Sequence, residues 1–257
     1  MNALDITNLG VRFKTREAVS DVSLSVPAGR TVGLVGESGS GKSTIAHAAV
    51  GLVPVSSGHI RVYGESALGR GRAQRAARRR IQVVFQDPFS ALNPRMPIGQ
   101  SIAEGLLATG RDFSRGEREA RVAELLRQVD LDPARATELP RAFSGGQRQR
   151  ITIARALAGE PDILIADEVT SALDVSVQST VLNLLRELQQ RLGLSMLFIS
   201  HNLAVVRYIS DEIVVMRQGR IVEAGETEAL LSDPAEEYTR ELLAAVPVLG
   251  RRWESGG

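Results

Sequence analysis

Short apolar stretches alternate along this chain with longer segments of helical spacing, which is the pattern of an α/β fold. Alternating apolar and polar positions over residues 4–7 and 22–26 predict a pair of antiparallel strands near the N-terminus. Nearly continuous apolar runs predict buried strands at residues 31–35, 81–85, 163–166 and 195–199. A hairpin around Gln218 and Gly219 and a closing helix with Tyr238 complete the pattern.

The segment from about residue 98 to residue 157 interrupts this alternation because its apolar positions keep helical spacing. These positions include Val122, Leu125, Leu126 and Val129. Ser114 and Glu117 have the spacing of a capping box at the start of one helix. Since the segment has its own apolar stripe, we expect residues 98–157 to form an inserted helical subdomain. The whole of residues 1–245 would then be one domain, with residues 246–257 as a short tail.

A glycine-rich turn follows the strand predicted at residues 31–35. It matches the phosphate-binding pattern G-x-x-x-x-G-K-[ST] with Gly36, Glu37, Ser38, Gly39, Ser40, Gly41, Lys42 and Ser43, and Thr44 opens the next helix. In such a loop the backbone N–H groups cradle a phosphate, and glycines allow the close approach. Lys42 would supply positive charge for the β- and γ-phosphates, and the Ser43 hydroxyl can bind Mg²⁺.

Composition limits the remaining function classes. The 257 residues, 43% of them hydrophobic, can bury the core of one large domain. The net charge of +1 gives no general attraction to nucleic acid or anionic membranes. The absence of cysteine excludes disulfides, thiol catalysis and cysteine-bound metal. No secretory signal is visible, and residues 45–55, the longest nearly apolar run, are too short to span a bilayer. We therefore expect any membrane role to come through a partner.

Arginines cluster between residues 70 and 80, at Arg70, Arg72, Arg75, Arg78, Arg79 and Arg80. Such a run can form a stripe that binds nucleic acid. Because alanines lie among these arginines and no aromatic residue does, we favour the interpretation that they form a solvated helix face.

Polar side chains stand at the ends of three predicted buried strands: Gln86, the pair Asp167 and Glu168, and His201. In α/β folds this end of the strands is where ligands bind. Because successive strand residues point to opposite sides, the two carboxylates need not share a role. Asp167 can reach a Mg²⁺ ion that Ser43 holds, and Glu168 can act on water as a general base.

Two further features allow more than one interpretation. Ser144, Gly145, Gly146 and Gln147 precede a helix predicted over residues 148–158. Ser144 can cap this helix, and the N–H groups at its positive end can bind an anion, but a simple capped turn has the same sequence. Phe13 can pack in the core or stack on a nucleotide base.

Together, in this order, the motifs resemble the ATPase subunit of an ATP-binding-cassette (ABC) transporter over residues 4–245. Residues 85–95 (FQDPFSALNPR), 171–178 (SALDVSVQ) and 238–247 (YTRELLAAVP) resemble the oligopeptide, dipeptide and nickel importer branch. The resemblance implies an α/β fold: a phosphate-loop NTPase core with a mixed sheet, an N-terminal antiparallel β-subdomain and an inserted α-helical subdomain. It also implies an ATPase that uses ATP and Mg²⁺ to drive uptake of a small peptide, nickel or a metal chelate.

The resemblance also implies roles for the site residues. Phe13 would stack on adenine, and residues 36–44 would hold the triphosphate. The ligands of Mg²⁺ would be Ser43, Asp167 and Gln86. The catalytic residues would be Glu168, which polarises the attacking water, His201, which steadies the γ-phosphate, Gln86 and Lys42. Residues 144–147 would contact the γ-phosphate bound by an opposite ATPase subunit in a head-to-tail dimer, and Asp174 would belong to the same interface.

The implied partners are two transmembrane permease subunits, a second ATPase subunit that is a sister chain or an identical copy, and indirectly an extracytoplasmic solute-binding protein. The chain would then lie at the cytoplasmic face of the cell membrane. We expect no nucleic-acid partner. The solute is left open, because the choice lies mainly in the binding protein and the permeases.

Two positions depart from the family pattern. Phe143 replaces a leucine, and Val169 stands where a proline usually follows the catalytic glutamate, which leaves the stiffness of this loop open. The alternative function is a soluble ABC ATPase that acts on nucleic acid or in translation. The chain shows neither the long coiled coil nor the second cassette of such proteins, and it lacks the Asn-Lys-x-Asp motif of a GTPase.

Overall fold

The computed structural model describes residues 1–14 and 16–245, so the predicted tail at residues 246–257 lies outside the described residues. A four-stranded sheet contains the N-terminal strands β1 (Asn2–Phe13) and β2 (Arg16–Pro27) with β4 (Ser57–Val62) and β5 (Glu65–Ser66). Its order is β2-β1-β4-β5, and all its pairs are antiparallel. The predicted N-terminal antiparallel pair is confirmed, and both strands are longer than the alternating stretches that predicted them.

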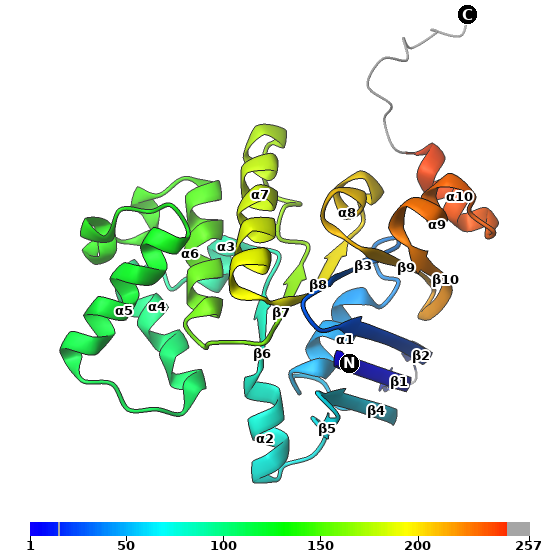
Figure 1. Ribbon diagram of the computed structural model, residues 1–257, viewed down its shortest axis with the longest axis horizontal. Helices are drawn as coiled ribbons and strands as arrows, with labels where there is room; N and C mark the ends of the chain where they lie inside the picture. The colour runs from blue at the N-terminus through cyan, green and yellow to red at the C-terminus, as the bar shows by residue number, and fades with distance from the viewer. Residues whose placement is uncertain (15, 246–257) are drawn as a thin grey trace, which may run out of the picture.

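A six-stranded sheet forms the centre of the molecule (Figure 1). Its order is β10 (Arg220–Glu226), β9 (Glu212–Arg217), β3 (Thr31–Val35), β8 (Ser195–Ser200), β7 (Ile163–Asp167) and β6 (Ile81–Val84). The strands from β9 to β6 are parallel, and β10 is antiparallel to β9. Every residue of β3, β7 and β8 is buried, as expected for strands covered on both faces.

The two faces of the central sheet pack in different cores. Ile163 and Ile165 of β7 join the N-terminal sheet and α1 (Lys42–Ala49) in one apolar cluster. Leu164 and Ala166 point the other way and join a second cluster with the helices on the opposite face. The helix α1 therefore lies between the two sheets, and the loop that precedes it is held at their junction.

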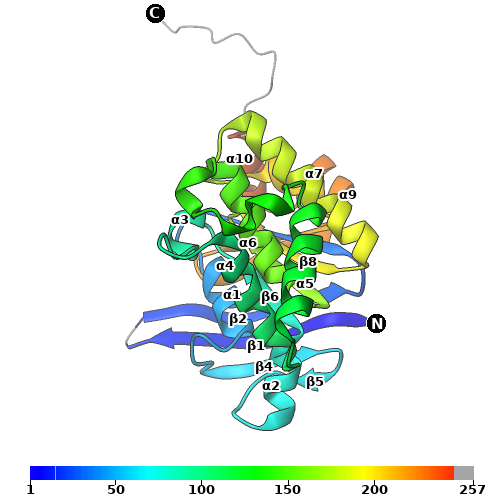
Figure 2. The ribbon, with the colours of Figure 1, turned by 90° about the vertical axis from the view of Figure 1, so that its left-hand side faces the viewer.

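Residues 98–157 are helical, as their spacing predicts. They contain α4 (Ile98–Gly105), α5 (Arg115–Gln128) and α6 (Gly145–Leu157), with the 3-10 turns Leu106–Thr109, Pro133–Thr137 and Pro140–Ala142. In Figure 2 this block lies in front of β6 and β8. The capping box at Ser114 is confirmed. Since Val122 and Leu125 belong to the same apolar cluster as Leu164, the block shares its core with the sheet, and its separation as a subdomain stays a prediction.

The other helices are α2 (Arg72–Arg79), α3 (Pro88–Ala91), α7 (Val175–Leu192), α8 (Leu203–Ile209), α9 (Thr227–Ser232) and α10 (Glu237–Ala244). As predicted, α7 ends at Gly193, whose φ of 65° suits glycine. The helix α2 carries most of the arginine run, and α10 lies at the opposite side of the sheet from the helical block (Figure 1). Of the helices in residues 1–14 and 16–245, none has both the length and the apolar character needed to cross a membrane.

Candidate functional site

The glycine-rich loop connects β3 to α1 at the carboxyl end of the central sheet, where α/β folds bind ligands. Two of its glycines meet backbone that leaves no room for a side chain. A Cβ on Gly36 would lie 2.0 Å from the Met216 carbonyl oxygen, and one on Gly41 would lie 2.6 Å from the Ala18 carbonyl oxygen. Gly41 also has a φ of 106°, which other residues rarely adopt. The loop is thus pressed against β2 and β9.

Lys42 begins α1 and folds back over the loop. Its Nζ donates hydrogen bonds to the carbonyl oxygens of Gly36, at 2.8 Å, and Glu37, at 2.7 Å. The side chain is buried, and this burial lowers its pKa, while the nearby carboxylates of Glu168 and Asp167 act in the opposite direction. The ammonium group is therefore held at the loop by two backbone carbonyl oxygens.

Ser43 and Asp167 form the second contact at the loop. Ser43 Oγ donates to Asp167 Oδ1 at 3.1 Å, joining the start of α1 to the end of β7. Asp167 is 4% exposed, and burial raises its pKa, with the Ser43 hydrogen bond opposing the shift. Within the described ranges no group of three or more His, Cys, Asp or Glu side chains could hold a metal ion. One carboxylate and one hydroxyl fit Mg²⁺, which keeps several waters and binds phosphate oxygens beside few protein ligands.

Glu168, Gln86 and His201 meet at the ends of three strands. Gln86 Nε2 donates to Glu168 Oε2 at 3.1 Å and to Ser171 Oγ at 3.3 Å. His201 Nδ1 lies 3.4 Å from the same Glu168 Oε2. Since β6, β7 and β8 are neighbours in the sheet, their polar ends converge as the sequence predicts. Gln86, also predicted as a Mg²⁺ ligand, has its hydrogen bonds with Glu168 and Ser171 in this structure.

Phe13 stands at the mouth of this region. Its side chain is 44% exposed, so the core-packing interpretation is wrong and a stacking platform remains. A cavity of about 420 Å³ brings Phe13 together with the loop, Gln86 and Glu168. Its lining is Phe13, Arg16, Ala18, Ser38, Gly39, Gly41, Lys42, Ser43, Thr44, Gln86 and Glu168. The sequence analysis did not single out Arg16 and Ala18, because they lie in a strand without a motif, and it used Ser171 only as part of the stretch at residues 171–178.

The turn at residues 144–147 lies elsewhere, at the start of α6. Ser144 Oγ accepts the Gln147 N–H at 3.3 Å, and Gln147 Oε1 accepts the Ser144 N–H at 3.0 Å, which makes a capping box. The helix begins at Gly145, so the prediction that it starts at residue 148 was wrong: both glycines adopt the first turn. Gly145 packs near Leu173, which places this turn beside exposed Asp174 at the start of α7.

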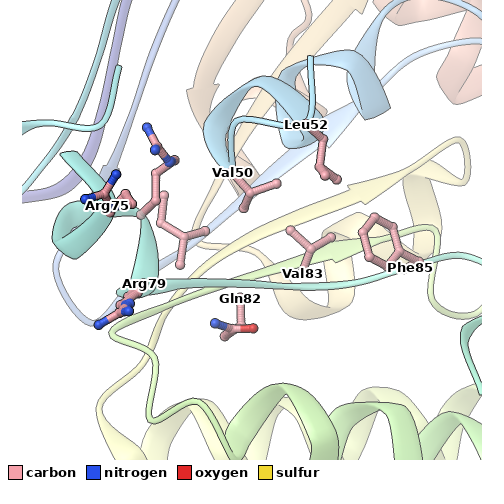
Figure 3. Close-up of a pocket in the computed structure, with 9 residues that line it drawn as sticks. Val50, Leu52, Arg75, Arg79, Gln82, Val83 and Phe85 are labelled. Carbon is pink, nitrogen blue, oxygen red and sulfur yellow. The ribbon is translucent and has the colours of Figure 1, made fainter. Parts of the chain in front are cut away.

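A separate groove of about 380 Å³ lies beside Phe85, along the edge strand β6 (Figure 3). Its apolar lining includes Val50, Leu52 and Val83, and the arginines of α2 form its rim. Arg75 and Arg78 donate to backbone carbonyls, and in the part of the chain that the structure describes no salt bridge involves either of them or Arg79. Arg75, Arg78 and Arg79 thus form a positively charged rim of the groove, whereas Arg80 of the same run pairs with Asp162 at 2.7 Å.

Comparisons with known proteins give consistent results. Residues 19–171 match the family described as ABC transporter. A protein of Brucella abortus, provisionally named a peptide import ATP-binding protein, is 53% identical over 232 residues, covering 90% of this chain and 69% of its own length. A Brucella ovis protein with the same kind of name is 49% identical over 249 residues, covering 95% of this chain and 78% of its own length.

Solved structures show the same architecture. The structure of cbiO1 from Clostridium perfringens, part of the ABC transporter complex cbiONQ, superposes with a TM-score of 0.81 at 26% identity. The match covers 90% of this chain and 91% of cbiO1. A dimeric ATP-binding cassette in a post-hydrolysis state, bound to ADP and Pi, has a TM-score of 0.75 at 26% identity, covering 87% of this chain and 98% of that one.

Proposed function

Because this chain belongs to the ABC transporter family and is an ATPase of that family, we propose that it drives the import of peptides as the ATP-hydrolysing subunit of a transporter. The names of both Brucella relatives support peptides, rather than nickel or a metal chelate, as the solute. The observation that carries the chemistry is the convergence of Lys42, the Ser43 and Asp167 pair, and Glu168 around one cavity.

The loop and its neighbours would bind the nucleotide. The N–H groups at the start of α1 have no partners within the helix, so they can donate to phosphate oxygens. Lys42 would add its buried positive charge, and the exposed ring of Phe13 would cover the base. Ser43 and Asp167, whose side chains already touch, would hold Mg²⁺. When bound, this ion would neutralise charge that develops on the phosphate oxygens.

Glu168 would take the proton of the attacking water. In the described structure, the contacts of its side chain with Gln86 and His201 both involve Oε2. Oε1 is therefore the oxygen that can accept a proton from water, while Gln86 and His201 fix the orientation of the carboxylate. This arrangement gives Gln86 and His201 positioning roles beside Glu168. In its imidazolium form, with both nitrogens protonated, His201 can also donate from Nε2 to a phosphate oxygen.

A second ATPase subunit would complete the site. Ser144 is exposed at the positive end of α6, and the helix presents N–H groups there that favour an anion. The turn at residues 144–147 is not among the residues that line the cavity of its own subunit. We therefore propose that this turn contacts the nucleotide of the opposite subunit and that Asp174 belongs to the same interface, in a dimer with a sister chain or with a copy of itself.

The groove on β6 is the proposed contact with the permeases. It is apolar at its floor, it is rimmed by arginines, and no acidic side chain lines it within the described residues. Its residue Phe85 directly precedes Gln86, so an occupant of the groove would touch the segment that holds Glu168. The occupant that fits is a short permease segment with apolar side chains flanked by carboxylates. The protein would thereby lie peripherally at the cytoplasmic face of the membrane.

The test is purification of the tagged chain from detergent-solubilised membranes, followed by reconstitution and peptide uptake. Recovery of two polytopic subunits, with ATP-dependent uptake of peptide, is the expected result. The double variant Arg75→Glu, Arg79→Glu should lose the permeases while ATP hydrolysis by the isolated chain remains. The matched control Arg70→Glu, Arg72→Glu makes the same charge change outside the groove and should retain them. Salt-sensitive recovery of DNA or RNA in place of permeases would instead support the nucleic-acid alternative.

A further inference from the structure

Tyr238 of α10 reaches the phosphate-binding loop from the far end of the chain. The Glu37 N–H donates a hydrogen bond to Tyr238 Oη at 3.1 Å, across 201 residues of sequence. Tyr238 lies outside the residues that match the family, which end at residue 171. The partner of the hydroxyl belongs to the loop that would hold the phosphates.

The peptide bond between Gly36 and Glu37 connects Tyr238 to Lys42. Its N–H points to Tyr238, and its carbonyl oxygen, on Gly36, accepts Lys42 Nζ at 2.8 Å. A trans peptide is planar, with its N–H and C=O pointing in opposite directions, so fixing one end fixes the other. Hydrogen bonding at the N–H also polarises the carbonyl and strengthens the bond that Lys42 makes with it.

This peptide needs such a support because glycine leaves it free to rotate. Gly36 is required where it is, since a Cβ would meet the Met216 carbonyl oxygen, but glycine lacks the steric barrier that would hold one peptide orientation. If the peptide turned, its carbonyl oxygen would leave Lys42, and the ammonium group would lose one of its two backbone acceptors. The Tyr238 hydroxyl opposes that rotation.

Tyr238 is itself well fixed. Its side chain is 3% exposed and belongs to the apolar core, and the guanidinium of Arg217 lies 4.6 Å from the centre of its ring. Burial raises the pKa of the phenol, so the group stays neutral and its oxygen accepts the Glu37 N–H across the physiological range. A rigid ring thus presents the hydroxyl at a constant position.

We propose that Tyr238 is a positioning residue of the nucleotide site, which holds the Lys42 ammonium in place through the peptide between Gly36 and Glu37. The proposal rests on the role proposed above for Lys42 as a phosphate contact. Through this peptide and Lys42, the helix α10 would affect the affinity for the phosphates of ATP. It would do so without touching the nucleotide.

The test compares the ATP affinity of the Tyr238→Phe variant with that of the wild-type protein, both as the full chain. This change removes the hydroxyl and keeps the ring beneath Arg217. A net hydrogen bond of this kind corresponds to roughly a 3- to 10-fold change in affinity, so the Kd for ATP should rise about that much. The affinity for adenosine, which has no phosphate, should stay the same. In a Lys42→Ala background, Tyr238→Phe should cause no further loss of ATP affinity, because the group that it positions is gone.

The chain contains a matched control. Tyr208 also has a hydroxyl hydrogen bond within the fold, although as the donor, to Asn183 Oδ1, and its ring also lies beneath a guanidinium, that of Arg186 at 5.6 Å. Tyr208→Phe should leave the affinity for ATP unchanged. A Tyr238→Phe protein with a lower Tm but an unchanged Kd for ATP would overturn the proposal, because the tyrosine would then be merely structural.

A second measurement does not depend on a folded variant. In the wild-type protein, the Glu37 amide should exchange its hydrogen slowly, and rapid exchange would contradict the bond to Tyr238. The outcomes also separate this inference from the proposed function. If Lys42→Ala leaves ATP binding intact, the phosphate-loop assignment fails together with the inference. If Lys42→Ala weakens binding and Tyr238→Phe does not, only the role of Tyr238 fails.

Discussion

Gln86 donates a hydrogen bond to Glu168 across 3.1 Å, although 82 residues separate the two in sequence. The bond joins the end of the edge strand β6 to the end of β7, and His201 approaches the same carboxylate oxygen from β8. Gln86 also follows Phe85, which lines the groove on β6. A displacement of this segment by a docked partner would therefore change the orientation of Glu168 directly, which links the proposed docking surface to the proposed base.

Replacing Glu168 with glutamine should separate nucleotide binding from hydrolysis. The variant keeps the size of the side chain and its contact with Gln86 but cannot accept a proton. We expect ATP binding to be retained and kcat to fall by roughly 10²- to 10⁴-fold, the usual effect of losing a general base. Steady-state phosphate release and a nucleotide titration measure the two quantities.

Glu187→Gln is the control, because it makes the same chemical change on an exposed position of α7. It should hydrolyse ATP at the wild-type rate. Glu168→Gln with wild-type turnover would remove Glu168 from the proposed role. Light scattering of Glu168→Gln with ATP adds a second result: dimers indicate self-association, and persistent monomers indicate that a sister ATPase is required.

The binding of Mg²⁺ should weaken as the pH falls through the raised pKa of Asp167. Burial favours the protonated acid, and Mg²⁺ needs the carboxylate, so metal binding must release a proton below that pKa. Below it, affinity should fall by about tenfold per pH unit, and the decline should begin at a higher pH than for an exposed aspartate. The folding stability of the metal-free protein should depend on pH in the opposite direction. The raised pKa of Asp167 adds stability at low pH, and this stability is lost as the pH rises through the raised pKa.

Calorimetric titration of Mg²⁺ with ADP, in buffers of different ionisation enthalpy, measures this proton release. Asp167→Asn should bind Mg²⁺ weakly and show little dependence on pH. An affinity of the wild-type protein that stays constant down to the pKa of an ordinary aspartate would contradict the assignment of Asp167 as a ligand.

Replacing Phe13 with alanine should weaken ATP binding only by removing the stacking of the ring on the adenine base. Stacking of an aromatic side chain on a base contributes about 1–3 kcal/mol, which corresponds to roughly a 5- to 150-fold rise in Kd. Binding of inorganic tripolyphosphate should be unaffected, since it has no base. Phe13→Trp should retain the affinity for ATP, and Leu107→Ala, a change at another exposed apolar residue, should not alter it. Equal losses for ATP and tripolyphosphate would argue against stacking.

Much of this site could be predicted because its residues stand at the ends of buried parallel strands. Apolar runs identified β6, β7 and β8, and parallel strands in one sheet bring their carboxyl ends to one edge, so the convergence of Gln86, Glu168 and His201 followed. The contact of Ser43 with Asp167 followed in the same way, because a phosphate-binding loop comes directly after a strand of the same sheet.

Other features depend on tertiary contacts that leave no local pattern. The hydrogen bond between Glu37 and Tyr238 joins a loop to a helix far along the chain, and no periodicity connects them. The short helices α3, α8 and α9 were not predicted, because each has fewer residues than a helical pattern needs to be recognised. The exposure of Phe13 was open for a related reason: an aromatic residue at a strand end fits either a core or a platform.

Replacing Val169 with proline tests whether the loop after Glu168 is already rigid. The Ser171 N–H donates to the Glu168 carbonyl at 3.1 Å, which closes a turn with Val169 in its second position. The Ser171 hydroxyl donates to the same carbonyl at 2.9 Å, and Gln178 Nε2 donates to the Thr170 carbonyl at 2.9 Å. These hydrogen bonds support the turn in place of the proline that the family usually has, so we expect the loop to be rigid with valine.

Proline suits the second position of such a turn, because its fixed φ is the one that this position adopts. The hydrogen bond that closes the turn does not use the N–H of the second residue. Because proline restricts the unfolded chain, Val169→Pro should raise the free energy of unfolding by about 0.4–1 kcal/mol. Any packing energy lost with the buried valine side chain would reduce this gain. Val169→Pro should leave kcat unchanged, because the hydrogen bonds of Ser171 and Gln178 already hold the turn. Ser171→Ala, which removes one of the hydrogen bonds, should lower kcat, and Val169→Pro should restore part of the loss. Thermal unfolding and phosphate release measure both effects, and a large rise in kcat for Val169→Pro alone would show that the wild-type turn is too loose to hold Glu168.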